Sequence, residues 1–300
     1  MPSGAFQLLI GWATVIYGIK VVVKYVLGID QAGRNFRVYP DDTFVVSYAR
    51  SGNLWTRFMV ATLLHPETEV RLSNIERFAP DTSNQSNRAL KRTPRPRLIK
   101  THNYFDHRYK RIIYVVRDPR DVMLSYYNFQ KKYRQLNDNV PLEKYVDNFV
   151  NGTLGSEGWG SWYENVASWV MTRHKDPNFL LLRYEDMIQD TLRELRKIAA
   201  FLGVECSPSR LNEVVALSSA DRMRQLEKED ANEWVGTKNR RQDIPMIGVA
   251  TSGGWRKVLP KECVAKIETA WGDLMTRVGY ELAVRDKLPA SPIPVRLGRQ

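Results

Sequence analysis

A buried strand that runs into a glycine-containing loop and then a helix constrains this chain most. Residues 43–48 (Thr-Phe-Val-Val-Ser-Tyr) begin apolar and β-branched, as a strand buried on both faces does. The loop 49–53 follows, and from Leu54 apolar residues recur at spacings of three and four, which predicts a helix. Free N–H groups and the positive end of the helix dipole converge at such a helix start. The segment therefore predicts an anion cradle, with an ordinary strand–turn–helix as the alternative.

Two side chains at the tip of this loop also suit an anion. Arg50 supplies a positive charge and Ser51 supplies a hydroxyl donor. A P-loop kinase or nucleoside triphosphatase would use the same architecture, but it would carry Gly-Lys-Ser/Thr at the helix start. This chain has Gly52-Asn53-Leu54 there, which disfavours that class of enzyme.

A second short strand, residues 97–102, carries two chemically useful side chains near its end. Lys100 and His102 fall at its C-terminal edge, and in open α/β sheets ligands bind at that edge. A neutral histidine is a suitable general base near pH 7. A lone histidine is more often structural, so this strand alone leaves both roles open.

A third apolar strand, residues 111–116, ends in the segment Arg117-Asp118-Pro119-Arg120-Asp121. Proline is favoured at the first position of a helix, so Pro119 predicts a helix start. Arg117 at the strand end and Ser125 in the helix can then face the same phosphate. A surface arginine and a solvent-facing serine are the alternative for this segment alone.

The net charge limits the kinds of partner, and the cysteine count limits the kind of scaffold and the redox compartment. The net charge of +12 indicates an anionic partner, which can be a phosphorylated ligand, a nucleic acid or an acidic membrane face. Cys206 and Cys263 are the two cysteines, which excludes a disulfide scaffold and fits a reducing compartment. Neither has a second cysteine at metal-ligand spacing, and we expect no metal.

Five motifs together resemble the family of sulfotransferases that use 3′-phosphoadenosine 5′-phosphosulfate (PAPS) as sulfuryl donor. Residues 47–55 resemble the loop that holds the 5′-phosphosulfate, residues 97–102 the strand with the catalytic Lys and His, and residues 114–129 the 3′-phosphate motif. Further matches lie at 160–166 and 180–187. The resemblance, to the cytosolic type of this domain, runs from about Phe44 to Tyr280.

This resemblance implies a fold and a domain division. The fold is α/β, a three-layer domain whose central parallel sheet has Thr43–Tyr48 and Ile112–Val116 in its middle, with a P-loop-like strand–loop–helix for the phosphosulfate. We expect the sulfotransferase domain to span 31–300 and residues 1–30 to form a separate hydrophobic helix. The co-substrate would be PAPS and the product 3′,5′-bisphosphoadenosine.

The resemblance also implies roles for individual residues. His102 would be the general base, and Lys100 and Arg50 would stabilise charge on the bridging oxygen and 5′-phosphate. Arg117 and Ser125 would hold the 3′-phosphate. The full set of expected nucleotide-binding residues is Arg50, Ser51, Gly52, Asn53, Leu54, Trp55, Arg117, Ser125, Tyr184 and Ser218, with Trp55 and Tyr184 on the adenine side.

Departures from the family pattern keep a second hypothesis open. The family usually has Lys at Arg50 and a Thr pair at Asn53 and Leu54. It also has an Arg-Lys-Gly triplet where this chain reads Gly248-Val249-Ala250. Candidates to replace those charges are Arg240, Arg241 and Arg256. A catalytically impaired nucleotide-binding protein of the same fold is therefore the alternative to an active enzyme, whereas the intact Lys100 and His102 favour the enzyme.

The stretch Phe6–Leu27 is apolar over most of its length. It can be a membrane anchor, an interfacial amphipathic helix, or a helix docked on the domain. Basic residues follow it and none precede it, so the positive-inside rule would put the catalytic domain on the cytoplasmic side of a membrane. We expect a cytoplasmic protein, with anchoring to the cytoplasmic face of a membrane as one possibility.

Two polar segments are expected to shape the acceptor pocket. Residues 67–97 read as a long surface loop, and residues 221–247 as a charged segment that is either a lid over the nucleotide or a solvated loop. Their composition does not identify the acceptor. Lipid, steroid, phenol, sugar and peptide acceptors with a hydroxyl or amine remain open, and we expect no nucleic-acid partner.

Overall fold

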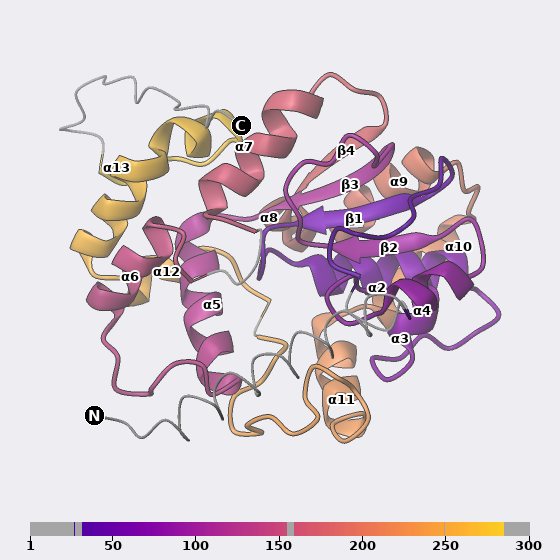
Figure 1. Ribbon diagram of the computed structural model, residues 1–300, viewed down its shortest axis with the longest axis horizontal. Helices are drawn as coiled ribbons and strands as arrows, with labels where there is room; N and C mark the ends of the chain where they lie inside the picture. Colours follow the sequence, from indigo (N-terminus) through magenta and orange to yellow (C-terminus); the bar gives the residue numbers. More distant parts are fainter. Residues whose placement is uncertain (1–26, 28–31, 155–158, 249, 285–300) are drawn as a thin grey trace, which may run out of the picture.

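A four-stranded parallel sheet forms the centre of the protein, seen in a computed structural model that describes residues 27, 32–154, 159–248 and 250–284 (Figure 1). The strands are β1 (Thr43–Ser47), β2 (Leu98–Thr101), β3 (Arg111–Val116) and β4 (Phe179–Arg183), in the order β2-β1-β3-β4. In this register Phe44 lies opposite Ile99 on one side and Ile112 on the other. The prediction that β1 and β3 occupy the middle of the sheet is confirmed.

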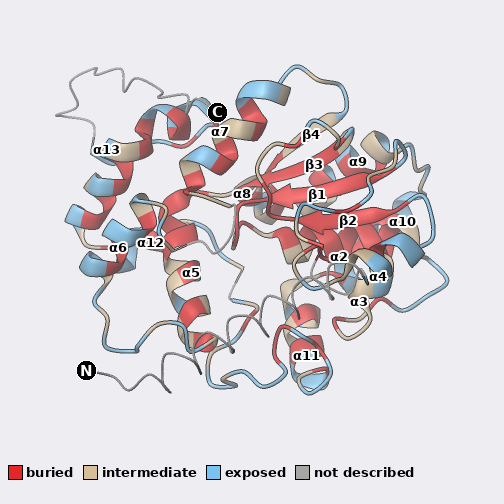
Figure 2. Ribbon diagram, in the orientation of Figure 1, coloured by how far each residue is buried: buried red, intermediate tan, exposed pale blue. Residues whose placement is uncertain are grey.

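The middle positions of the strands are mostly apolar because helices cover both faces of the sheet. Side chains alternate between the faces, so Phe44, Val46 and Tyr114 belong to one buried cluster while Val45 and Ile113 belong to another. All five residues of β1 are buried, and Figure 2 shows β1, β2 and β3 almost wholly in the colour of buried residues, whereas β4 is mostly half-buried. This double burial explains the uninterrupted apolar runs in the sequence.

Helices cover each face, which confirms the three-layer α/β fold (Figure 1). On the Phe44 face pack α5 (Pro119–Lys132), α6 (Leu142–Val150), α7 (Trp162–Arg173), α12 (Trp255–Val258) and α13 (Lys261–Arg277). On the Val45 face pack α2 (Asn53–Leu64), α8 (Tyr184–Gln189), α9 (Thr191–Leu202) and α10 (Pro208–Leu217).

The helix starts follow their sequence signals. Pro119 occupies the first turn of α5, as predicted, and the Asp118 side chain caps that helix by accepting from the Arg120 N–H at 2.9 Å. Ser161 and Glu164 form a reciprocal capping box at the start of α7. These caps fix the beginnings of two helices that face the sheet's C-terminal edge.

The segment 67–97 is not the surface loop that we predicted. It contains α3 (Ile75–Phe78) and α4 (Asn87–Arg92), and its residues Val70, Leu72 and Ile75 are buried in a third apolar cluster with Phe58 of α2. Single apolar residues are scattered among polar ones here, without a helical or strand period. The sequence pattern therefore does not indicate that this segment packs against α2.

The segment 221–247 is likewise packed, so the solvated-loop alternative is wrong. It begins with α11 (Ala220–Glu229), and Trp234 and Met246 are buried in the same third cluster. The Glu227 carboxylate accepts hydrogen bonds from the Met246 N–H at 2.6 Å and the Ile247 N–H at 2.9 Å. These contacts hold residues 246–247 against α11.

The predicted hydrophobic helix at Phe6–Leu27 lies outside the described residues, apart from Leu27. The division into 1–30 and 31–300 therefore stays a prediction. Among the residues that the structure describes, no helix combines the length and apolar character needed to cross a membrane.

Candidate functional site

A cavity of about 590 Å³ lies where the loop after β1, the end of β2 and the start of α5 meet. Residues from segments 220–236, 240–248 and 250–251 also line it. Of the predicted site residues, those that line it are Arg50, Gly52, Asn53, Leu54, Trp55, Lys100, His102, Arg117, Ser125 and Tyr184. Ser51 and Ser218 do not line it. The sheet topology thus brings three distant motifs to one place.

The loop after β1 is tightly shaped. Arg50 and Gly52 both have left-handed backbones, with φ of 65° and 98°. A Cβ on Gly52 would lie 2.5 Å from the Tyr184 ring, so only glycine permits this packing. Asn53 Nδ2 ties the loop to β1 by donating to Ser47 Oγ at 3.1 Å.

The same loop leaves polar groups open for a ligand. Gly52 has no side chain to cap α2, so the first N–H groups of that helix receive no such bond. Among the described residues Ser51 Oγ has no hydrogen-bond partner either, although it is buried beneath the cavity lining and does not belong to it. Buried polar atoms rarely lack partners. This arrangement suits an anion such as the 5′-phosphosulfate of PAPS.

Lys100 at the end of β2 is held by a carboxylate. Its Nζ lies 2.8 Å from Asp81 Oδ2, and both side chains are buried. Burial lowers the pKa of Lys100, against the opposing effect of Asp81. Burial would raise the pKa of Asp81, but the charges of Lys100 and Arg57 outweigh it and lower that pKa. Sequence reasoning missed Asp81, because its segment gave no periodic signal.

A second ion pair lies on the same wall of the cavity. Arg57 of α2 reaches Glu76 of α3 at 2.7 Å, and both line the cavity beside Asp81. This wall, which we call the paired wall, therefore has two cations and two carboxylates in contact: Arg57, Glu76, Asp81 and Lys100.

His102 has its tautomer fixed by the main chain. Its Nδ1 lies 2.7 Å from the Ser47 carbonyl oxygen, and a carbonyl can only accept, so Nδ1 carries the proton. In the neutral ring Nε2 is then free to take a proton. Burial and the charge of Lys100 lower the pKa of His102 to about 3, so the ring is neutral at pH 7. The Trp159 ring meets its edge, with centroids 4.9 Å apart.

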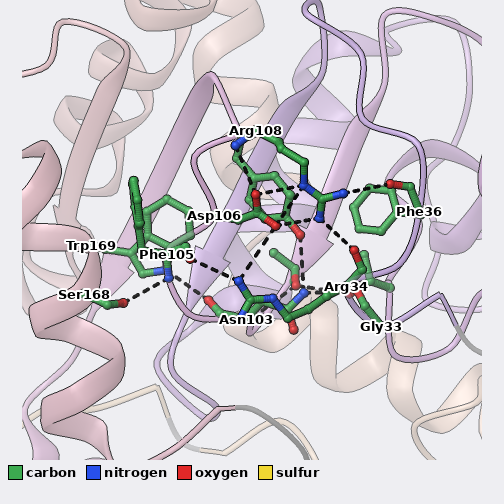
Figure 3. A network of polar contacts seen from close by, with 12 residues as sticks. Gly33, Arg34, Phe36, Asn103, Phe105, Asp106, Arg108, Ser168 and Trp169 are labelled. Carbon is green, nitrogen blue, oxygen red and sulfur yellow. Dashed lines mark hydrogen bonds and ion pairs between the residues drawn. The ribbon is translucent and has the colours of Figure 1, made fainter. Parts of the chain in front are cut away.

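The loop after His102 is anchored on both sides, as Figure 3 shows. Asn103 Nδ2 donates to the Gly33 carbonyl at 3.1 Å, while Trp169 Nε1 of α7 donates to the Asn103 carbonyl at 3.0 Å. Further along, Arg108 pairs with Asp106 at 2.6 Å and donates to the Arg34 carbonyl at 2.7 Å. This network fixes the chain direction just beyond His102 and so keeps the imidazole in place.

Arg50 and Arg117 approach each other in another part of the cavity lining. Arg117 Nη1 donates to the Arg50 carbonyl at 3.2 Å, and its guanidinium lies 4.2 Å from the Tyr184 ring centre. Arg50 Nε donates to Ser125 Oγ at 3.1 Å, and Nη2 donates to the Met246 carbonyl at 2.9 Å. Burial and the Arg117 charge lower the pKa of Arg50 to about 10. We call Arg50, Arg117 and Ser125 the unpaired wall.

Two charged residues of the segment after β3 have structural contacts. Arg120 is buried, pairs with Asp118 at 2.7 Å and with Glu268, and stacks on Trp255 at 3.8 Å. Asp121 accepts from the Gly253 N–H at 2.6 Å and so joins α5 to the following segment.

The adenine-side predictions have mixed outcomes. Trp55 and Tyr184 line the cavity and meet edge to face, with centroids 5.9 Å apart. Ser218 does not present its hydroxyl to the cavity: it is buried, and Oγ donates to the Val214 carbonyl at 2.6 Å. Its carbonyl instead accepts from Trp55 Nε1 at 2.8 Å. The Ser218 hydroxyl thus faces its own helix and not the cavity, and its contact with the nucleotide stays a prediction.

The three arginines proposed to replace the missing triplet differ in their contacts. Arg241 pairs with Asp138 at 2.7 Å and Asp243 at 2.6 Å. Arg256 stacks on Trp255 at 4.5 Å and does not line the cavity. Arg240 lines it and stacks on Tyr133 at 4.2 Å. Within the described part of the chain, no group of three or more His, Cys, Asp or Glu side chains is placed to hold a metal ion.

Comparison with known proteins gives a consistent result. Residues 40–279 match the family model for the sulfotransferase domain. The chain is 29% identical over 274 residues to "Sulfotransferase 1A1" of Mus musculus, covering 85% of this chain and 91% of that protein. It is 31% identical over 202 residues to "Sulfotransferase 2A1" of Homo sapiens, covering 63% of this chain and 69% of that one.

Solved structures share the fold. Retinol dehydratase in complex with androsterone and the inactive cofactor PAP has a TM-score of 0.67 at 21% identity, covering 81% of this chain and 83% of that one. A mouse sulfotransferase complexed with PAP has a TM-score of 0.64 at 22% identity, covering 82% and 88%.

Proposed function

The chain belongs to the sulfotransferase domain family of PAPS-dependent enzymes, and from that premise we propose that it sulfates a small-molecule hydroxyl or amine with His102 as general base. The resemblance read from the motifs is thereby confirmed at the level of the family. The acceptor and the roles of individual residues are the content of the proposal.

The fixed tautomer of His102 carries this proposal. Nδ1 is committed to the Ser47 carbonyl at 2.7 Å, which leaves Nε2 as the basic atom of a neutral ring that lines the cavity. A general base must be unprotonated at the working pH and must face the acceptor. The low pKa of about 3 keeps the ring neutral, and proton transfer to it occurs as the acceptor oxygen gains positive charge.

The reaction moves one group and one proton. The acceptor oxygen forms a bond to sulfur while the bond from sulfur to the bridging oxygen of the 5′-phosphate breaks. The acceptor proton goes to His102 Nε2, and 3′,5′-bisphosphoadenosine leaves. By analogy with phosphoryl transfer, such a step depends mainly on positioning and on stabilising charge at the leaving oxygen. The loop N–H groups after Ser51 and the Lys100 ammonium would supply that stabilisation.

The donor's two ends would bind at different elements. The open start of α2 and the unpartnered Ser51 hydroxyl suit the 5′-phosphosulfate. Arg117 and Ser125 suit the 3′-phosphate, and Arg117 Nε is buried without a hydrogen-bond partner. The aromatic rings of Trp55 and Tyr184 suit the adenine.

The acceptor is proposed as a small molecule that carries a hydroxyl. Structures of retinol dehydratase, a relative by fold, are described in complex with androsterone and with retinol. Trp159 lies against His102, and Tyr126 also lines the cavity; these aromatic side chains suit an apolar ring or chain. An amine acceptor would also be compatible with the chemistry.

The test combines a donor assay with one substitution. The purified protein is incubated with labelled PAPS and a panel of phenols, steroids, aliphatic alcohols, sugars and amines. His102→Ala should lower turnover by ~10²–10⁴-fold while its affinity for 3′,5′-bisphosphoadenosine stays nearly unchanged. The matched control is His107→Ala, because His107 is exposed and does not line the cavity.

Two outcomes would contradict the proposal. Near-full activity of the His102→Ala protein would remove His102 as the base. Tight nucleotide binding without transfer to any acceptor in the panel would instead support the catalytically impaired alternative, which the missing basic triplet at 248–250 motivates.

A further inference from the structure

We propose that Arg50 binds the 3′-phosphate of the donor, jointly with Arg117 and Ser125, and thereby replaces the basic residues that positions 248–250 lack. This inference rests on the proposed function, because it assumes that the donor carries a 3′-phosphate. It changes the role expected from the sequence, in which Arg50 faced the 5′-phosphate and the bridging oxygen.

The direction of the Arg50 side chain is the first argument. Arg50 lies in the loop after β1, but its guanidinium points to α5, where Nε donates to Ser125 Oγ at 3.1 Å. The far end of the group donates to the Met246 carbonyl at 2.9 Å and contacts the Met246 sulfur at 3.0 Å. A 3′-phosphate held by Ser125 would therefore lie within reach of Arg50.

The lack of a carboxylate partner is the second argument. Among the described residues, no carboxylate lies within 4.0 Å of the guanidinium of either Arg50 or Arg117. Arginines that are more buried do have such partners, since Arg57 pairs with Glu76, Arg97 with Asp42, and Arg120 with Asp118. Half-buried Arg71 and Arg241 are paired as well, whereas half-buried Arg111 donates to the Phe201 carbonyl.

The two neighbouring guanidiniums repel each other, and no described carboxylate lies within 4.0 Å of either, although Glu227 acts on Arg50 and Asp121 on Arg117 from farther away. The Arg117 charge is one cause of the lowered pKa of Arg50, and Arg117 has a further buried N–H without a partner. Like charges placed together in a protein are unfavourable until an anion joins them. A phosphate dianion matches the two positive charges and offers three oxygens to the two arginines and the serine.

The third argument is that the other described cations of this region are engaged elsewhere, including Arg240, which lines the cavity but stacks on Tyr133 at 4.2 Å. Gly248 and Ala250 bring no charge to the positions of the family's basic triplet. Arg224 does reach this segment, donating to the Gly248 carbonyl at 2.9 Å, but its charge is offset by Asp221. Arg241 is offset by Asp138 and Asp243. Arg50 is thus a cation without a carboxylate partner that already touches Ser125.

The inference is tested by measuring the affinity of matched variants for each of two nucleotides. Dissociation constants for 3′,5′-bisphosphoadenosine and 5′-AMP are measured by calorimetry, and their ratio isolates the 3′-phosphate. Arg50→Asn should weaken binding of the bisphosphate at least about tenfold, while binding of 5′-AMP changes less than about threefold. Asparagine is chosen because it tolerates the left-handed backbone of residue 50.

Two further variants keep the test decisive. Arg50→Lys keeps the charge but loses the forked geometry, so it should reduce the nucleotide preference by less than Arg50→Asn does. It also serves if Arg50→Asn does not fold. Arg241→Ala removes a guanidinium that two carboxylates already offset, and it should leave the ratio unchanged.

The outcomes separate this inference from the proposed function. If the unmodified protein prefers the bisphosphate, yet Arg50→Asn weakens both nucleotides equally or neither, the assignment of Arg50 is overturned and the proposed function stands. If Arg50→Asn folds poorly, an unchanged ratio in Arg50→Lys also overturns the assignment. If the unmodified protein binds both nucleotides equally, the donor assignment itself fails and the inference fails with it.

Discussion

The paired wall and the unpaired wall of the cavity differ in whether their cations have carboxylate partners. On the paired wall, Lys100 and Arg57 each touch a carboxylate, at 2.8 Å and 2.7 Å. On the unpaired wall, Arg50 and Arg117 touch a serine, main-chain carbonyls and aromatic rings, and no carboxylate of the described chain lies within 4.0 Å of them. Both walls line the same space, so their difference does not follow from depth alone.

This difference indicates what each wall is for. A cation buried beside its own carboxylate is compensated during folding, and removing one partner is costly. A cation left without a carboxylate lowers stability slightly but keeps its charge for a ligand. The unpaired wall therefore suits strong binding of a dianion, whereas the paired wall adds little net charge, and only Lys100 within it is proposed to stabilise the leaving oxygen.

The largest expected effect comes from giving the unpaired wall a carboxylate. Ser125→Asp would place a negative charge beside Arg50, which should stabilise the free protein and repel a phosphate dianion. Loss of two charge-assisted contacts, each worth ~1.5–3 kcal/mol, predicts an affinity for 3′,5′-bisphosphoadenosine lower by on the order of 10²–10⁴-fold. Calorimetry measures the affinity, and thermal unfolding measures the stability.

Ser125→Ala is the control for that substitution. It removes the hydroxyl without adding charge, so it should weaken the bisphosphate much less and should not raise the melting temperature. A Ser125→Asp protein that keeps its nucleotide preference, or that melts earlier than the Ser125→Ala protein, would show that the two arginines do not act as an anion site.

The reverse experiment breaks a pair on the paired wall. Asp81→Asn leaves the buried Lys100 ammonium without its carboxylate. Breaking a buried pair typically costs about 3–5 kcal/mol, and the remaining amide oxygen places this variant near the lower end, at about 3 kcal/mol. Denaturant unfolding measures the loss.

An exposed ion pair provides the comparison for Asp81→Asn. Lys266 and Asp147 lie 2.5 Å apart with both side chains exposed. Asp147→Asn should change the free energy of unfolding little, because water screens such pairs. Equal losses at Asp81 and Asp147 would mean that the paired wall is not stabilised by its ion pairs.

Most of the fold could be predicted because its signals are local. The strands β1, β2 and β3 and the helices after β1 and β3 were predicted from apolar runs and helical spacings in the sequence. The segment 67–97 was missed because its burial depends on tertiary contacts, such as those of Val70 and Leu72 with Phe58. The segment has no helical or strand periodicity from which that packing could be predicted.

The candidate site likewise has features that the sequence predicts and features that it does not. Strand ends could be predicted to gather Lys100, His102 and Arg117, since parallel strands end at one edge. Side-chain directions could not: Ser218 turns its hydroxyl back to its own helix, and Arg50 turns to α5. Asp81 was missed for a third reason, because it reaches Lys100 from a neighbouring segment that pairs alongside β2.

The smallest expected effect concerns the stability cost of keeping His102 neutral between the two walls. Its pKa is about 3 in the folded protein because of burial and the Lys100 charge, against ~6.5 for an unfolded histidine. Between these values the unfolded chain binds more protons, so the free energy of unfolding falls as pH falls. One such group contributes up to about 1.4 kcal/mol per pH unit. The contribution is fully present above about pH 6.5 and is lost as pH falls toward 3.

His102→Asn should reduce the slope of unfolding free energy against pH by that amount over pH 4–6, and His107→Asn, an exposed control, should not. An unchanged slope in the His102→Asn protein would mean that the imidazole is protonated as readily folded as unfolded, which would remove the electrostatic basis for treating His102 as a neutral general base.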